Sequence, residues 1–189
     1  MYKEKQTMAD MTGKQIPEVT FKCRVGDDQQ ITDDGCGFVG GEWQDISTAD
    51  IFKGKRVGIF SLPGAFTPTC SSEQLPGYEE KYAELKAAGL DEVYCVSVND
   101  AFVMNAWFRD QKITQVKCIP DGNLDFTKGI GQFTTFRNRG FGNRSWRYSA
   151  VIQDQIVEKM WIEPGNCADS EADPFEVSDA GTMLEYLNQ

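Results

Sequence analysis

Runs of apolar residues alternate along the chain with segments whose apolar residues recur every three or four positions. The continuous runs predict buried strands at 57–62 and 93–98, a short strand at 116–119, and two further strands at 149–152 and 156–162. The periodic segments predict two amphipathic helices, one with Leu75, Tyr78, Tyr82 and Leu85 and one with Phe102, Ala106, Trp107 and Ile113. Gly89 ends the first helix, and Pro76 either opens or kinks it.

The N-terminal part of the chain has a weaker pattern. Residues 1–13 are polar, and we expect them to form a flexible segment that precedes a single domain over 14–189. A weak alternation over 16–25 predicts a first strand. Residues 26–44 are rich in Gly, Asp and Gln, which predicts a hairpin or a long loop.

The order of the remaining elements predicts an α/β fold. Ser47 is expected to cap a short helix over 48–52, and Ser178 to cap the last helix of the chain. Strands and helices alternate first, and two adjacent strands follow, which predicts a mixed sheet with helices on its faces. Ligands bind beyond the carboxyl ends of parallel strands in such sheets, and Cys70 follows the end of the strand at 57–62.

Charge and hydropathy limit the partners of the chain. Its 189 residues carry a net charge of −10, which argues against general binding to nucleic acids or anionic membranes. No apolar stretch approaches the roughly 18–20 residues of a membrane span, and the N-terminus resembles no signal peptide, so we expect a cytoplasmic protein. Residues 137–147 interleave arginines with aromatic residues, a pattern typical of single-stranded nucleic-acid binding. In so acidic a chain, we favour the interpretation that one arginine positions the active site and that the others lie on a solvated loop.

The composition in Cys and His restricts the chemistry. The six cysteines form no C-x-x-C pair, which excludes a thioredoxin-type motif, and the chain has no histidine, which excludes Cys–His and Ser–His–Asp catalysis. Turn residues and then a helical pattern surround Cys70, so we expect it near the first turn of a helix. Unpaired N–H groups and the helix dipole stabilise a nucleophilic thiolate there. The alternative is a small buried apolar residue.

The segment Pro63-Gly-Ala-Phe-Thr67-Pro-Thr-Cys70 resembles the active-site motif of peroxiredoxins of the peroxiredoxin-5 (type II) class. Further segments agree with this class in order and spacing: 75–78, 97–103, 105–107, 120–123, 144–149, 157–160 and 175–179. The resemblance implies a thioredoxin-like fold, a mixed central β-sheet flanked by helices, here with an extended N-terminal hairpin. It also implies an enzyme that reduces hydrogen peroxide and organic hydroperoxides with thiols, without a cofactor or a metal.

The resemblance also implies roles for individual residues. Cys70 is the peroxidatic cysteine, the Thr67 hydroxyl orients the peroxide, Pro63 shields the pocket and the Arg147 guanidinium lies beside the thiolate. Arg109 matches a second arginine of the family that supports the first.

The chain departs from the family at two places. Gln74 stands where the family often has His; it retains hydrogen bonding but does not titrate, so a pH switch is not expected there. Residues 26–44 are longer than the usual first hairpin, and we assign them no function.

The step that regenerates Cys70 stays open at the level of sequence. Cys95 lies in a predicted central strand, and Cys167 in an acidic loop before the last helix. Either one is a candidate resolving cysteine, with a buried structural residue as the favoured interpretation of Cys95. The third possibility is a one-cysteine cycle, in which glutaredoxin with glutathione, or thioredoxin, reduces Cys70 directly.

Two other classes of function compete with a peroxidase. One is a peroxide sensor that passes oxidation to a partner protein through a mixed disulfide. The other is a silent thioredoxin-like binding module, which has no need of Pro63, Thr67, Cys70 and Arg147 together. The family commonly forms homodimers through the region around the active site, so we expect a homodimer.

Overall fold

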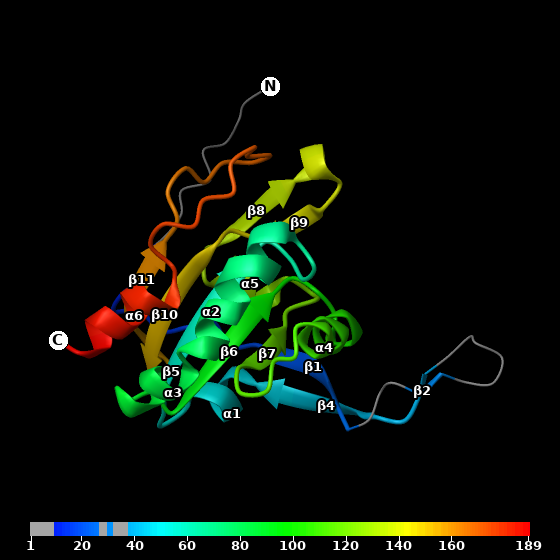
Figure 1. The fold of residues 1–189 in the computed structure, drawn as a ribbon, viewed down its shortest axis with the longest axis horizontal. Helices are drawn as coiled ribbons and strands as arrows, with labels where there is room; N and C mark the ends of the chain where they lie inside the picture. The colour runs from blue at the N-terminus through cyan, green and yellow to red at the C-terminus, as the bar shows by residue number, and fades with distance from the viewer. Residues whose placement is uncertain (1–9, 27–29, 32–37) are drawn as a thin grey trace.

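The computed structural model describes residues 10–26, 30–31 and 38–189, and its centre is a five-stranded mixed sheet (Figure 1). The strand order is β11-β10-β5-β6-β7. β5 (Arg56–Leu62), β6 (Glu92–Ser97) and β7 (Lys117–Pro120) run parallel, and β10 (Tyr148–Gln153) is antiparallel to both β5 and β11 (Ile156–Ile162). These bounds confirm the mixed sheet expected from the apolar runs.

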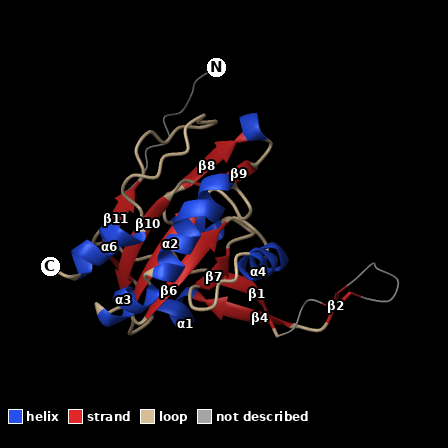
Figure 2. Ribbon diagram, viewed as in Figure 1, coloured by secondary structure: helices blue, strands red, loops and turns tan. Residues whose placement is uncertain are grey.

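Helices and an N-terminal hairpin cover the two faces of the sheet (Figure 2). One face packs against four helices: α2 (Leu75–Glu80), α3 (Tyr82–Ala87), α4 (Ala101–Asp110) and α6 (Ala180–Leu187). The other face packs against α1 (Thr48–Phe52), α5 (Asp125–Gly129) and β1 (Thr20–Val25). The chain therefore has the thioredoxin-like arrangement with helices on both faces.

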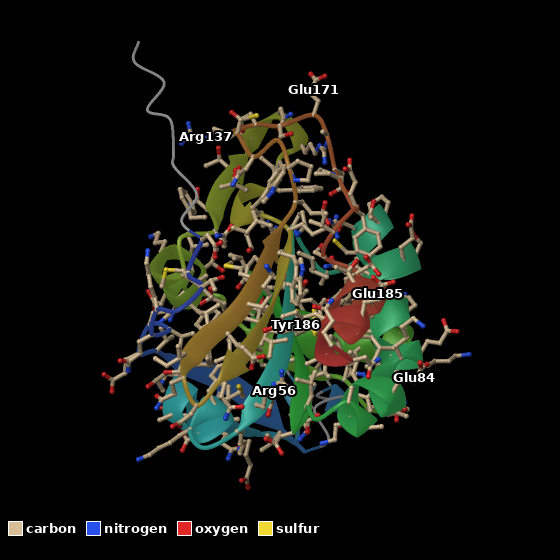
Figure 3. All side chains as sticks on the ribbon, turned by 90° about the vertical axis from the view of Figure 1, so that its left-hand side faces the viewer. Arg56, Glu84, Arg137, Glu171, Glu185 and Tyr186 are labelled. Atoms are coloured by element: carbon tan, nitrogen blue, oxygen red, sulfur yellow. The ribbon has the colours of Figure 1, made fainter. Side chains whose placement is uncertain are left out.

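Gly58 of β5 lets α6 pack closely on the sheet. A Cβ atom at this position would lie 2.7 Å from Cδ1 of Leu90 and 3.0 Å from the sulfur of Met183. Polar contacts fix the same helix at its other end, because Arg56 and Tyr186 both donate hydrogen bonds to Glu158 of β11 (Figure 3).

Antiparallel pairs outside the central sheet extend the fold. β1 pairs with β4 (Glu42–Ser47), and β2 (Gln30–Ile31) pairs with β3 (Phe38–Val39) farther along the same hairpin. This pairing confirms the extended N-terminal hairpin; Cys36 lies outside the described residues.

A second hairpin, β8 (Phe133–Phe136) with β9 (Gly142–Ser145), was not expected from the sequence; a 3-10 turn, Arg137–Arg139, joins its strands. Its buried positions are Thr134, Phe136 and Ser145, so no apolar alternation marks it.

The helix expected around residues 75–85 is interrupted. A π-turn, Cys70–Gln74, precedes α2, and Lys81 separates α2 from α3. Pro76 has no N–H to bond to an earlier carbonyl, and the wider π-turn directly before it accommodates that loss. Leu75, Tyr78 and Leu85 are nevertheless all buried, because both helices turn the same apolar side to the sheet.

The two predicted N-caps have different outcomes. Ser47 caps α1 as expected, through a capping box in which it and Asp50 bond each other's backbone N–H groups. Ser178 does not cap the last helix. Asp179 does, by accepting a bond from Thr182 N, because the hydroxyl of Ser178 donates to the buried carboxylate of Glu163 instead.

The boundary at residue 13 stays a prediction, since residues 1–9 lie outside the described part. Of the residues next to it, Met11 packs against the core, and Gly13 N donates to Val157 O of β11 at 2.8 Å. In the described ranges, no helix is both long and apolar enough to cross a membrane.

Candidate active site

Cys70 lies where the loop after β5 becomes a helix. Helical backbone begins at Pro68, so Cys70 falls in the first turn, as expected. The π-turn starts at Cys70 itself, whose carbonyl accepts the N–H of Leu75. π-turns inside helices are often found at functional sites. The Cys70 side chain is 0% exposed and packs in the apolar cluster of the α2 face.

Arg147 brings a charge to this buried thiol. It lies between β9 and β10, is 1% exposed, and places Nη1 3.5 Å from Cys70 Sγ. The same Nη1 donates to Gln74 Oε1 at 2.5 Å, and Nη2 donates to Asp173 Oδ1 at 2.5 Å. The Phe175 ring covers the guanidinium, whose carbon lies 5.7 Å from the ring centroid. Three side chains from two parts of the chain, Gln74, Asp173 and Phe175, therefore hold one guanidinium beside the sulfur.

The guanidinium stays charged at this buried position. Burial lowers the pKa of Arg147, but the charges of Cys70 and Asp173 and their hydrogen bonds act against burial. The net result is a pKa above the usual arginine value. Arg147 is thus a permanent hydrogen-bond donor and cation within reach of the sulfur.

Thr67 and Pro63 belong to the loop before Cys70. The Thr67 hydroxyl donates to Gly64 O at 2.7 Å, and a carbonyl only accepts, so the hydroxyl proton is committed to that bond. The oxygen of Thr67 keeps its lone pairs for an incoming O–H group. Pro63, at the start of this loop, is buried.

One side chain from the loop after β6 and one from α4 fix the segment before and after Cys70. Asn99 Oδ1 accepts the N–H of Ala65 at 3.0 Å, and Trp107 of α4 donates from its indole to Ser71 Oγ at 3.0 Å. Phe66, with a left-handed φ of 61°, is 55% exposed beside this network. Hydrogen bonds to Asn99 and Trp107 therefore fix the loop, and the ring of Phe66 is exposed to solvent.

Gln74 fills the position that departs from the family. It is 0% exposed, and its amide oxygen accepts the bond from Arg147. Its amide nitrogen is buried and has no hydrogen-bond partner among the described residues. Gln74 therefore supports the guanidinium with a neutral acceptor.

The two candidate resolving cysteines lie in different surroundings. Cys95 of β6 is 0% exposed, and burial, followed by the charges of Cys118 and Cys70, raises its pKa well above the usual thiol value. Cys167 is exposed in the loop after β11, and its carbonyl accepts a bond from Thr134 of β8. Within the described part of the chain, every cysteine is a free thiol.

Arg109 lies at the exposed C-terminal end of α4. There it lines a cavity of about 660 Å³ between α4, β1 and β7, whose lining does not include Cys70, Thr67 or Arg147. Its support for Arg147 stays a prediction.

Asp173 and Phe175 are the site residues that sequence reasoning missed. Both lie in the segment between β11 and α6, about 26 residues beyond Arg147, and only the fold brings them to the guanidinium. The segment 175–179 resembles the family in sequence, but nothing in its pattern indicates a contact with Arg147. The described residues contain no cluster of three or more His, Cys, Asp or Glu side chains that suits a metal ion.

Comparison with known proteins identifies the family of the chain. The Redoxin family model matches residues 11–184. The hybrid peroxiredoxin hyPrx5 of Haemophilus influenzae is 48% identical over 180 residues, which cover 95% of this chain and 67% of that protein.

Solved structures of peroxiredoxins superpose on the chain. The Plasmodium falciparum antioxidant protein, a 1-Cys peroxiredoxin, superposes with a TM-score of 0.83 and 32% identity, over 93% of this chain and 98% of that one. Reduced Prx3 of Vibrio vulnificus in complex with H2O2 gives a TM-score of 0.77 and 33% identity, over 95% and 97% of the two chains.

Proposed function

The chain belongs to the redoxin family and is a peroxiredoxin, a thiol-dependent peroxidase, and on that basis we propose that Cys70 is the thiol that attacks the peroxide. The observation that carries the proposal is the 3.5 Å approach of Arg147 Nη1 to Cys70 Sγ, with both side chains buried. A charged donor at this distance stabilises the thiolate and faces the bond that is to be broken.

The reaction follows from these contacts. The Cys70 thiolate attacks one oxygen of the peroxide, an S–O bond forms, the O–O bond breaks, and the distal oxygen leaves as water or alcohol after taking a proton. Thr67 Oγ1, whose proton is bonded to Gly64 O, accepts the hydrogen bond of the peroxide hydroxyl and orients it. Arg147 donates to the oxygen on which charge develops. Pro63 keeps water from the sulfur.

We further propose that an external thiol regenerates the enzyme. Cys95 is a poor resolving thiol, because burial keeps it protonated in the middle of a strand. A first reductant thiol attacks the Cys70 sulfenic acid and releases water, and a second thiol reduces the mixed disulfide. Glutaredoxin with glutathione, or thioredoxin, supplies these thiols. Exposed Cys167 is the alternative if its loop moves to Cys70.

A homodimer through the active-site face also belongs to the proposal. Phe66, beside the Cys70 loop and 55% exposed, is a large apolar side chain that a second copy would cover. Sedimentation of wild type and of Phe66→Ser tests this: a dimer that Phe66→Ser weakens supports it, and a monomeric wild type contradicts it.

Intact mass after one equivalent of peroxide tests the peroxidase and its resolution together. Wild type, Cys95→Ser and Cys167→Ser should each gain about 16 mass units as a sulfenic acid, whereas an internal disulfide loses about two. Cys70→Ser should keep its fold, gain no oxygen at this position and consume no peroxide. Full turnover by Cys70→Ser would refute the proposal.

Turnover with a reductant separates the enzyme from a sensor. A peroxidase consumes peroxide repeatedly when thioredoxin, or glutaredoxin with glutathione, is supplied. A sensor is oxidised once and stops until its partner protein is added.

A further inference from the structure

The segment between β11 and α6, residues 163–179, lies beside β8 and reaches the active site (Figure 1). Its first residue, Glu163, is 1% exposed, although it is an acid. The Glu163 carboxylate accepts bonds of 2.7–3.0 Å from the backbone N–H groups of Glu176, Val177 and Ser178 and from the Ser178 hydroxyl. A buried charge bonded in this way fixes the two ends of the segment to each other.

Further bonds hold this segment against the rest of the molecule. Tyr78 of α2 donates to Ser178 O at 2.9 Å, and the Trp146 indole donates to Glu163 O at 2.8 Å. At the far end, Asp169 N donates to Thr135 O of β8 at 2.7 Å. Asp173 and Phe175 lie between these anchors, and both face Arg147.

The bonds around Arg147 show what Asp173 contributes. Nη1 of the guanidinium is shared between Cys70 and Gln74, and Nη2 is bonded to Asp173. Nε is buried and has no hydrogen-bond partner among the described residues, so it does not restrain the group. Without Asp173, Nη1 would be the donor of every remaining hydrogen bond described for the guanidinium. A planar group with hydrogen bonds at one nitrogen alone has a less restricted orientation than a group bonded at two.

We propose that Asp173 is a positioning residue of the peroxidase reaction, which holds Arg147 Nη2 so that Nη1 points at Cys70 Sγ, and that Glu163 holds the segment that carries Asp173. The inference rests on the proposed function, because it assigns Asp173 a role through Arg147. The side chain of Asp173 is 27% exposed, and its described contact is with Arg147 and not with the sulfur of Cys70.

Asp173→Ala tests the proposal with two reactions of the same thiol. The second-order rate with H2O2 depends on Arg147 facing the O–O bond. Alkylation by iodoacetamide needs the thiolate, which the charge of a reoriented guanidinium still stabilises, but it needs no aligned donor. We expect Asp173→Ala to lower the peroxide rate by about tenfold, typical of losing a hydrogen bond to a charged group, and to change alkylation by less than about threefold. Asp173→Asn keeps the acceptor oxygen and should restore most of the peroxide rate.

Glu171→Ala is the matched control, since it removes a carboxylate from the same segment. Glu171 lies at the outer end of the segment, pointing away from the body of the molecule (Figure 3), and its described bond uses its backbone carbonyl. We expect an unchanged peroxide rate. Equal losses in Asp173→Ala and Glu171→Ala would overturn the proposal, as would parallel losses of peroxide rate and alkylation rate.

Glu163→Gln tests the second half of the proposal. Glutamine keeps one acceptor oxygen but loses the negative charge, and it places an NH2 group in the position of Oε2, against the N–H of Glu176. This loosens the segment and should lower the peroxide rate in the same direction as Asp173→Ala. The double variant should be no slower than the slower single variant, because both act through one contact. Additive losses would overturn the link between Glu163 and Asp173. If Glu163→Gln does not fold, the three variants at 171 and 173 decide the role of Asp173 alone.

Arg147→Lys, together with Cys70→Ser, distinguishes a failure of this inference from a failure of the proposed function. If Arg147→Lys keeps the full peroxide rate, the role proposed for Arg147 fails and that of Asp173 fails with it; the proposed function itself fails only if Cys70→Ser keeps its turnover. If Arg147→Lys is slow and Asp173→Ala is as fast as wild type, only the role of Asp173 fails.

Discussion

Cys70 and Cys95 are two buried thiols of one apolar cluster, and they differ in what surrounds the sulfur. Both side chains are 0% exposed. In Cys95, burial raises the pKa well above the usual value, and the weaker effect of Arg147 in the opposite direction does not offset it. Cys70 has the guanidinium 3.5 Å from its sulfur. Burial alone therefore gives an inert thiol, and the charged donor at contact distance is what distinguishes the site.

Arg147→Lys should produce the largest effect, because it weakens the contact by which the surroundings of Cys70 differ from those of Cys95. Lysine keeps a charge but presents one nitrogen, which cannot bond Cys70, Gln74 and Asp173 in the present geometry. We expect the stopped-flow rate with H2O2 to fall by about a hundredfold, as for loss of one oxyanion-hole donor. Arg137→Lys, on the exposed turn between β8 and β9 (Figure 3), is the control and should react at the wild-type rate.

Thr67→Val should produce a smaller effect on the same rate. It removes the oxygen that accepts the peroxide hydroxyl, together with the bond to Gly64 O, while it keeps the size of the side chain. The loss should be about tenfold, the usual order for one hydrogen bond. Thr67→Ser retains the hydroxyl and should recover most of the rate. Equal rates for the valine and serine variants would show that the hydroxyl takes no part.

The sequence predicted the parts of the molecule that depend on continuous apolar runs. β5, β6 and β10 are mostly buried and apolar, so their pattern is local and visible. The position of Cys70 in the first turn of a helix followed from turn residues next to such a run. Its chemical role, and that of Arg147, came from resemblance to a family.

The sequence did not predict the polar contacts that complete the site. The carboxylate of Glu163 is buried, but a single Glu near a strand end gives no sign of its partners 13 to 15 residues later. Asp173 lies 26 residues beyond Arg147, and only the course of the segment between β11 and α6 brings the two together. Contacts of this kind depend on tertiary structure, and no period or motif encodes them.

Cys95→Ser should produce the smallest effect, and on stability rather than on rate. The pKa of Cys95 is raised on folding, so between about pH 9 and its folded pKa the unfolded chain loses a proton that the folded chain keeps. This contribution to stability is complete below the ordinary thiol pKa of 9.0 and is lost as the pH rises toward the folded value. From that ordinary value, the loss is about 0.8 kcal/mol at pH 9.5.

Urea unfolding of wild type and Cys95→Ser at pH 7.5 and pH 9.5 measures this contribution. Serine does not titrate in this range, so the difference in unfolding free energy between the two proteins should shrink by about 0.8 kcal/mol at the higher pH. Other groups with raised pKa values, such as Tyr78, are common to both proteins and cancel in the difference. A difference that is constant with pH would mean that Cys95 ionises as easily in the folded protein as in the unfolded chain. The contrast between a thiol with a guanidinium and one without would then lose its physical basis.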